Sequence, residues 1–227
     1  MNLIVDQRMD MGNGVYFIEY TKEVQFRRWF LPEELDYLID KNVPMAEQKN
    51  IVRAYVKETY ALHGKEIERG TAMVKKNWKK VEKEFFKLAD DIFAGHPWSK
   101  GNYGGIATVF GMYPRWIDKK RFFFPYIHKI EKYADCVIAH EMLHFIFFDY
   151  IKKYYKLYEY SKIKGKEDDY IWKVSETFNS VMENTTLKSI VGRKTKPYPG
   201  QEQMFRTMLA QWKKKQDIKW LLDQWLK

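Results

Sequence analysis

The sequence predicts an α+β fold that is mostly helical and carries a small sheet. Apolar residues spaced three and four apart run through residues 66–93, which is the period of one face of a helix. Two short runs, 106–113 and 121–124, have the apolar pattern of strands. A third run, 134–148, is compatible with a helix that is buried on nearly all sides. The long helix at 66–93 is expected to back the sheet.

The N-terminal residues predict a β-hairpin. Leu3–Val5 and Val15–Ile18 are short apolar runs, and Gly12-Asn13-Gly14 lies between them. Glycine and asparagine at such a position favour a tight turn between two strands. We therefore expect the chain to begin with two paired strands.

The rest of the chain is predicted to be helical outside the sheet. Pro32 begins a short helix, because proline is favoured at the first helical position. Gly64 separates two further helices, and Pro197 and Pro199 lie in a loop at 192–200. Besides the apolar run at 134–148, helices are expected over about residues 46–62, 66–93, 168–183, 201–214 and 217–226.

The composition is that of a folded protein with a substantial core. The chain has 227 residues, of which 45% are hydrophobic and 17% aromatic, enough for one large domain or a core with appended segments. Its one cysteine, Cys136, cannot form an internal disulfide, which favours a reducing compartment. Residues 1–11 lack the apolar run of a signal peptide, and no stretch reaches the roughly 18 apolar residues that span a membrane. We therefore expect a soluble, cytoplasmic protein that does not bind membranes.

The net charge of +10 is concentrated at the C-terminus. Residues 187–227 contain ten Lys or Arg and three Asp or Glu, a balance of +7. A basic segment can bind nucleic acid or an anionic membrane. However, Lys213-Lys214-Lys215 is the one compact cluster and no nucleic-acid motif accompanies it. A solvated face of C-terminal helices is therefore the preferred interpretation.

The strongest chemical signal is the sequence His140-Glu141-Met142-Leu143-His144, which has the pattern H-E-x-x-H. On a helix, residues four apart lie on one face, so both imidazoles can reach a single zinc ion. Glu141 lies on the same side as His144 and can contact a zinc-bound water without being a ligand. The flanking residues are apolar, and buried His and Glu side chains need partners, which a metal supplies. The motif predicts one Zn²⁺ held by His140 and His144, with Glu141 as the general base of a metalloprotease.

A catalytic zinc usually has three protein ligands, so a further ligand is expected. No histidine follows His144, and the third ligand from this half of the chain must be a carboxylate. Glu176 is the best candidate, because it lies 31 intervening residues past His144 on a predicted helix. Trp172, Asn179 and Glu183 fall on the same helical face as Glu176. Glu183 is the first alternative ligand, and Asp149, Asp168 and Asp169 are weaker candidates.

On these residues the chain resembles the gluzincin clan of zinc metallopeptidases. The resemblance rests on His140-Glu141-x-x-His144 and on Glu176 in a following helix, with a backing helix and strands ahead of them. The compact order over about residues 66–190, a little over half the chain, is most similar to the minimal members called minigluzincins. It implies a zincin-like core, a zinc cofactor and a peptide or protein substrate.

The resemblance also implies roles for residues around the metal. Thermolysin-like members have an Asp four residues after the glutamate ligand, where this chain has Ser180. Support for a liganding imidazole is therefore expected from Asn179 or Ser180. In such families an edge strand ahead of the active-site helix binds the substrate main chain, because an exposed edge has unpaired N–H and C=O groups. That strand would comprise Gly104, Gly105, Ile106, Ala107 and Thr108.

The expected mechanism is hydrolysis of a peptide bond by a zinc-bound water. Zinc lowers the pKa of the water, Glu141 takes its proton, and the resulting hydroxide attacks a carbonyl polarised by the metal. Glu141 then passes the proton to the leaving amine. The candidate for stabilising the oxyanion is Tyr198, which lies between two prolines, with Tyr113 and His128 as alternatives.

Two other functions stay open at the sequence level. The chain could bind zinc as an interaction or regulatory protein without turnover, or it could associate with nucleic acid through its basic C-terminus. Three segments are expected: N-terminal strands and helices at 1–63 that could act as a lid or pro-region, a zincin-like catalytic core at 64–190, and a basic helical segment at 191–227. The natural substrate and the oligomeric state are not predicted.

Overall fold

The computed structural model describes residues 1–21, 24–40, 43–128 and 132–227. They form two compact units. Unit 1 comprises Met1–Trp78 and Asn102–Val137, and unit 2 comprises Lys79–Gly101 and Ile138–Lys227. Two helices continue from one unit into the other, and each unit is described separately below.

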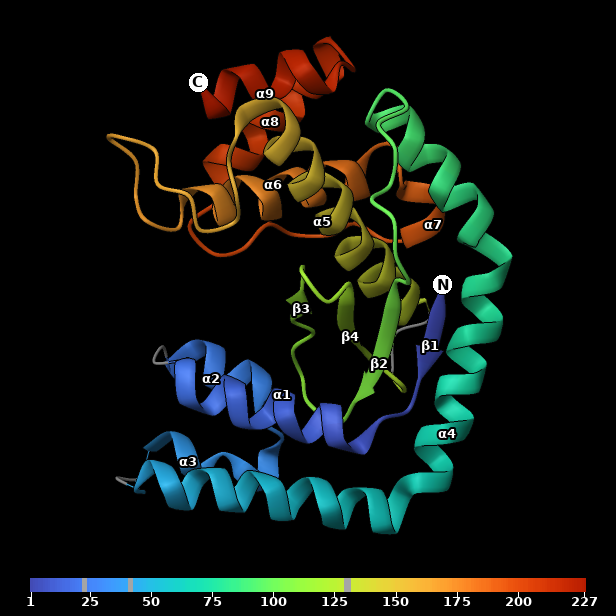
Figure 1. Cartoon of the computed structure of the whole chain (residues 1–227), viewed down its shortest axis with the longest axis vertical. Helices are drawn as coiled ribbons and strands as arrows, with labels where there is room; N and C mark the ends of the chain where they lie inside the picture. Colours follow the sequence, from blue (N-terminus) through green and yellow to red (C-terminus); the bar gives the residue numbers. More distant parts are fainter. Residues whose placement is uncertain (22–23, 41–42, 129–131) are drawn as a thin grey trace. The chain divides into compact units, whose positions relative to one another are not determined.

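The predicted α+β class is confirmed (Figure 1). The helices of unit 1 are α1 (Gln7–Tyr20), α2 (Val24–Phe30), the 3-10 turn η1 (Glu33–Leu35), α3 (Tyr37–Asp40) and the larger part of α4 (Met45–Ile92). Its strands are β1 (Asn2–Ile4), β2 (Gly104–Thr108), β3 (Arg115–Trp116) and β4 (Arg121–Pro125). Unit 2 contains the end of α4, most of α5 (Tyr133–Tyr155), α6 (Tyr170–Asn184), α7 (Lys188–Val191), α8 (Glu202–Lys214) and α9 (Ile218–Leu226).

The sheet of unit 1 is mixed and has the order β1-β2-β4-β3. β1 and β4 both pair with β2 in parallel, and β3 pairs with β4 antiparallel. The strand predicted at 121–124 is confirmed as β4, whereas the one predicted at 106–113 begins earlier and ends at Thr108. β2 is therefore an internal strand, and the prediction that it forms an exposed edge is wrong. Gly104, Gly105 and Ile106 pair with β1 on one side and with β4 on the other, so this part of the strand cannot add a substrate strand, whereas Ala107 and Thr108 pair with β4.

The predicted N-terminal hairpin is also wrong. β1 pairs with β2, and the next residues form helix α1, in which Gly12, Asn13 and Gly14 are interior positions. Asp6 is the N-cap of this helix, and its carboxylate accepts a hydrogen bond from the Met9 amide at 2.9 Å. A methyl group at Gly14 would lie 2.4 Å from the ring of Phe110. This glycine therefore permits close packing of the helix and does not form a turn.

The two helices predicted around Gly64 are a single helix. α4 runs without interruption from Met45 to Ile92. Glycine costs a helix interior only about 1 kcal/mol relative to alanine, which the remaining helical residues offset. The predicted segment boundaries at residues 63 and 190 both fall inside helices, α4 and α7. Within the described ranges, no helix combines the length and the apolar character that crossing a membrane requires.

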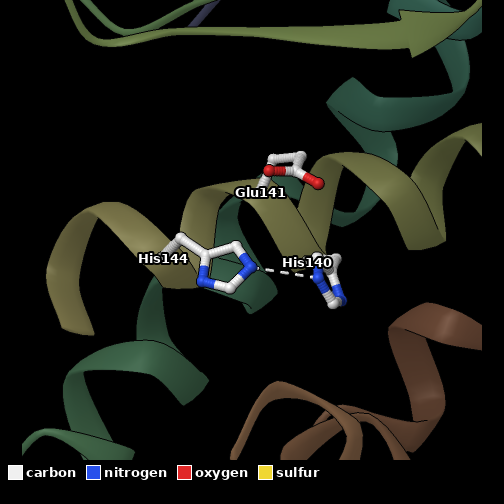
Figure 2. A group of neighbouring side chains, drawn as sticks. All are labelled: His140, Glu141 and His144. Atoms are coloured by element: carbon white, nitrogen blue, oxygen red, sulfur yellow. Dashed lines mark hydrogen bonds between the residues drawn. The ribbon is translucent and has the colours of Figure 1, made fainter. Parts of the chain in front are cut away.

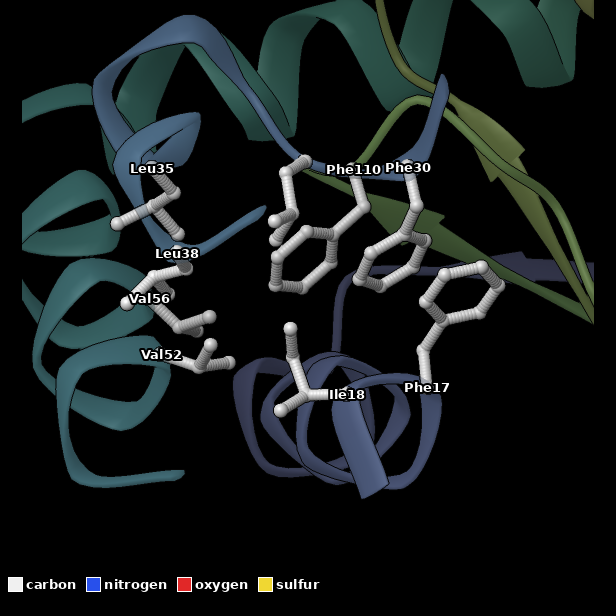
Figure 3. Packing of buried hydrophobic residues seen from close by; sticks show 9 residues of the cluster. Phe17, Ile18, Phe30, Leu35, Leu38, Val52, Val56 and Phe110 are labelled. Atoms are coloured by element: carbon white, nitrogen blue, oxygen red, sulfur yellow. The ribbon is translucent and has the colours of Figure 1, made fainter. Parts of the chain in front are cut away.

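The apolar core of unit 1 packs α1, α2 and α4 around stacked aromatic rings (Figure 3). The ring of Phe30 lies between those of Phe17 and Phe110, with centroid distances of 3.8 and 4.4 Å. Ile18 and Val52 complete the contact from α1 and α4. The side chains from these separate segments are fully or nearly buried, so this core holds the N-terminal helices together.

A buried carboxylate, that of Asp10, connects three segments of unit 1. Asp10 on α1 is inaccessible to solvent and accepts hydrogen bonds from Thr108 Oγ1 at 2.5 Å, the Val109 amide at 3.1 Å and the Tyr60 hydroxyl at 3.1 Å. Burial raises the pKa of Asp10 to about 6, although the three donors partly oppose that effect. Asp10 thus ties α1 to α4 and to the end of β2.

The core of unit 2 joins α5 to α6. Phe178 on α6 contacts Phe147 on α5 and Phe93 after α4, with ring centroids 5.2 and 5.6 Å apart. Thr177 donates a buried hydrogen bond to Gln201 Oε1 at 3.0 Å, which connects α6 to the start of α8. The helices predicted at 168–183, 201–214 and 217–226 correspond to α6, α8 and α9. This packing holds the two helices that carry the candidate metal ligands.

The two glycines in α4 should respond in opposite ways to replacement by alanine. A methyl group at Gly64 meets no atom within 4 Å, whereas one at Gly70 would lie 2.4 Å from the Tyr126 carbonyl oxygen. We expect Gly64→Ala to raise the free energy of unfolding by about 0.5–1 kcal/mol and Gly70→Ala to lower it by about 1 kcal/mol or more. Urea denaturation followed by circular dichroism measures both; equal effects of one sign would contradict the packing described for α4.

Asp10 should make unit 1 less stable as the pH rises from about 4 to 6. Its pKa is raised from 3.8 to about 6 in the folded protein, so the folded state binds the proton more tightly than the unfolded state in that window. The stabilisation from Asp10 is complete below its unfolded-state pKa of 3.8 and is lost as the pH rises through the folded-state pKa of about 6. The free energy of unfolding falls by on the order of 2–3 kcal/mol over this range.

Asp10→Asn should remove this loss, and unfolding free energies measured at pH 4, 5 and 6 would show it as a flatter profile than that of the unsubstituted chain. The exposed Asp36→Asn is the matched control, because it should leave the slope in place. Parallel profiles for Asp10→Asn and the unsubstituted chain would contradict the raised pKa.

Candidate metal centre

Helix α5 presents the H-E-x-x-H residues from a largely buried position, as the sequence predicted. The apolar residues around the motif are buried: Ile138, Ala139, Met142, Leu143 and the four residues that follow His144. His144 itself is fully buried, and Glu141 is 6% exposed. The apolar surroundings fix the helix, so the polar side chains are held in place by its packing.

The two imidazoles converge on one point. His140 and His144 lie one turn apart, and their Nε2 atoms are 3.0 Å from each other (Figure 2). Their ring planes are nearly perpendicular, with centroids 4.8 Å apart. His144 also stacks on Phe148, one turn further along α5, at 5.9 Å. Both rings are therefore oriented by the helix that carries them.

Glu176 brings a carboxylate from α6 to the same point. Its Oε2 lies 3.0 Å from His140 Nε2 and its Oε1 lies 3.3 Å from His144 Nε2. Two ligand atoms on a tetrahedral zinc ion, each about 2.0–2.1 Å from it, are about 3.3 Å apart. The two imidazole nitrogens and the two oxygens of one carboxylate thus lie at nearly the spacing that a tetrahedral ion requires, although they come from two helices.

Glu141 completes the group on α5. One ligand atom each from His140, Glu141 and His144 lies within 4.8 Å of the others, so the group could hold a metal ion. Glu141 follows His140 directly and leaves α5 in a different direction from the two imidazoles (Figure 2). One of its ligand atoms nevertheless lies within 4.8 Å of a ring nitrogen of each imidazole.

Glu183 orients His140 from the other side of the ring. Its Oε1 lies 2.6 Å from His140 Nδ1, and because a carboxylate only accepts, Nδ1–H is the donor. On the opposite side of the ring, Nε2 faces Glu176 and His144, and it too donates to a carboxylate, through a proton that a metal ion would displace. Glu183 is an alternative ligand in the sequence-based prediction, but it contacts Nδ1, the nitrogen for which support from Asn179 or Ser180 is expected.

Asn179 acts on the helix and not on the ring. Its Nδ2 donates to the backbone carbonyl of His140 at 2.9 Å, which fixes α6 against the turn that carries the metal site. The carbonyl of Ser180 accepts from Asn184 Nδ2 at 2.7 Å, within α6. The spacing identified Glu183, which lies seven residues after Glu176 and so on the same face of α6, but not the ring nitrogen that it contacts.

The carboxylates of α6 create a field that favours a cation at His140. Burial lowers the pKa of His140, but the charges and hydrogen bonds of Glu183 and Glu176 outweigh it and raise that pKa well above its ordinary value. Both glutamates are 2% exposed. Buried carboxylates are costly unless a positive charge compensates them, and the same field that favours a proton on His140 favours a metal ion.

The other predicted ligands have different partners. Asp149 lies 2.8 Å from Nε2 of the buried His96, Asp168 pairs with Lys162 at 2.9 Å, and Asp169 pairs with Lys173 at 3.1 Å. Each of these three acids has a basic partner away from the imidazoles, whereas the predicted ligands Glu176 and Glu183 both contact His140.

The predicted oxyanion candidates are in different parts of the structure. The ring of Tyr198 contacts Trp172 with a centroid distance of 5.2 Å, and Trp172 lies one turn before Glu176 on α6. Tyr198 is therefore held on the helix that carries the third donor. Tyr113 and His128 belong to unit 1, where both rings pack on Tyr133.

Comparison with known proteins gives no assignment: no family model, curated protein or solved structure matches the chain. What can be said of this site therefore comes from its own residues and their geometry.

Removing the orienting carboxylate should weaken metal binding without abolishing it. We expect Glu183→Ala to lower the affinity for Zn²⁺ about 10- to 100-fold, because the partner of a liganding histidine fixes its tautomer and orientation. Glu183→Gln, whose carbonyl can still accept from Nδ1–H, should lose less. Competition with a chromophoric chelator measures the affinity, and the exposed Glu202→Gln is the control. Unchanged affinity in Glu183→Ala would contradict the orienting role.

Proposed function

We propose that the chain is a zinc-dependent peptidase whose metal ligands are His140, His144 and Glu176 and whose general base is Glu141. The observation that carries the proposal is the convergence of two imidazole nitrogens and one carboxylate at separations of 3.0–3.3 Å. The minimal gluzincin pattern seen in the sequence supports the same interpretation.

The donor set favours zinc over other common metal ions. Two imidazole nitrogens and one carboxylate oxygen form a borderline-soft set that suits zinc, whereas magnesium and calcium prefer oxygen ligands alone. Three protein ligands leave a fourth position for water or substrate, which distinguishes a catalytic site from a closed structural one. When bound, the metal supplies Lewis acidity, which makes water more acidic and polarises a carbonyl group.

The residues of the chain supply the remaining steps. Glu141 accepts a proton from the attacking water and returns it to the leaving amine, and its low exposure keeps that proton from exchanging freely with solvent. Glu183 keeps His140 Nδ1 protonated, so that Nε2 faces the converging donors. Asn179 and the apolar contacts between α5 and α6 hold both helices while this happens.

Two substitutions at neighbouring glutamates should separate metal binding from hydrolysis. We expect Glu141→Gln to retain one zinc per chain and to lower peptide hydrolysis by about 10²-fold or more, because the amide cannot take a proton. Glu176→Gln should lose zinc, since it removes the charged ligand. Metal content by mass spectrometry and cleavage of a mixed peptide library measure the two properties.

The outcomes distinguish the competing functions. Peptide hydrolysis that persists in Glu141→Gln would refute the role of general base. Zinc bound by the unsubstituted chain without any cleavage across the library would refute the peptidase and support a zinc-binding protein without turnover. Zinc retained in Glu176→Gln would refute the ligand assignment.

A further inference from the structure

The exposed aromatic side chains of unit 2 are concentrated in one short stretch. Its large exposed hydrophobic residues are Tyr154, Tyr158 and Tyr160, which are 50%, 56% and 84% accessible; unit 2 lies wholly within the described ranges. All three follow or end helix α5, within seven residues of one another. Folded proteins seldom gather exposed rings in this way unless a surface binds something.

Exposed lysines alternate with these rings. Lys152, Lys153 and Lys156 lie at the end of α5, and all three are exposed. Lys152 Nζ lies 5.4 Å from the centre of the Tyr158 ring, and Lys153 Nζ lies 5.1 Å from that of Tyr154. Together these lysines and the three tyrosines are called the Lys–Tyr patch below.

The patch has a defined backbone. Lys156 adopts a left-handed conformation with φ of 59°, which ends α5 and turns the chain back on it. The amide of Tyr158 donates to Ser161 Oγ at 2.7 Å, and the amide of Ser161 donates to the Tyr158 carbonyl at 3.0 Å. This turn places Tyr158 over Lys152, so rings and charges are presented together.

The lysine charges of the patch are not neutralised within the described residues. No carboxylate there pairs with Lys152, Lys153 or Lys156, and the Lys156 ammonium group donates instead to the Lys153 carbonyl. Of the acids that follow, Glu159 lies between Tyr158 and Tyr160, whereas those further along the loop are engaged there: Glu167 and Asp169 contact Lys173, and Asp168 contacts Lys162. Three lysines against one glutamate leave the patch with a net positive charge.

We propose that the Lys–Tyr patch binds single-stranded nucleic acid. Lysines attract the phosphates, and bases stack on exposed aromatic rings with little dependence on sequence. A duplex would satisfy only the lysines, because its bases are already stacked internally. A membrane surface fits less well, because interfacial segments insert an apolar helical face and the patch lies on a helix end and a turn whose exposed rings are tyrosines. The proposal is independent of metal binding and hydrolysis.

The test measures binding of a labelled single strand of about 15 nucleotides to the full chain by fluorescence anisotropy. We expect the logarithm of the association constant to fall with the logarithm of salt concentration with a slope of about −2, as three lysine–phosphate contacts require. Combined Lys152→Gln, Lys153→Gln and Lys156→Gln should flatten that slope. Tyr154→Ser with Tyr158→Ser should weaken binding about fivefold or more, while the two Tyr→Phe changes should preserve it.

A control with the same change in charge combines Lys213→Gln, Lys214→Gln and Lys215→Gln. Those lysines are exposed, but Lys215 pairs with Asp217 and the ring beside it, that of Trp220 at 5.9 Å, is only half-exposed, so the control should bind nearly as the unsubstituted chain does. Equal loss in both triple variants, or Tyr→Ser variants that bind normally, would overturn the proposal. So would tighter binding to duplex of the same length, or binding to phosphatidylserine vesicles in the absence of oligonucleotide binding. Thermal unfolding of each variant excludes loss of fold as the cause.

Discussion

The candidate metal centre depends on one ring held between two carboxylates. His140 contacts Glu183 through Nδ1 and Glu176 through Nε2, and both acids come from α6. These two contacts fix the orientation of the ring, so its Nε2 atom has a fixed position and direction. His144 lies one turn away on α5, and the helix alone brings its Nε2 atom to 3.0 Å from that of His140. The order of the site therefore comes from the pairing of α5 with α6.

That pairing has to offset a considerable electrostatic cost. Glu141, Glu176 and Glu183 are all nearly inaccessible, and three carboxylates close together repel one another. The contact of Phe147 with Phe178 and the bond from Asn179 to the His140 carbonyl keep the helices in register against this repulsion. A cation between the imidazoles and the acids would lower this cost directly, so metal binding would stabilise unit 2.

The sequence predicts the parts of this protein that depend on local spacing. The spacing of H-E-x-x-H places both imidazoles on one face of α5, and the helical period places Glu176 and Glu183 on one face of α6. Which of the two glutamates faces Nε2 depends on how α5 and α6 pack, and no spacing along the chain contains that information. The predictions at Gly14 and Gly64 were wrong for a similar reason. Gly14 does not form a turn but packs against Phe110 across the core, and Gly64 does not end a helix but lies inside one with no atom opposite it. The position of β2 within the sheet depends on β1, which comes from about a hundred residues earlier in the chain.

Charge is a further case in which composition and structure differ. The C-terminal segment has the larger excess of basic residues, yet Lys219 and Lys227 both pair with Asp223 and Lys215 pairs with Asp217. The hydrogen bond of Tyr155 to Asp223 adds to these contacts, which hold the pKa of Asp223 well below its usual range. The lysines at the end of α5 are fewer, but they lack such partners among the described residues and stand beside exposed rings. A polyanion responds to the local field at its binding surface, and that field is set by which charges remain uncompensated more than by the total along a segment.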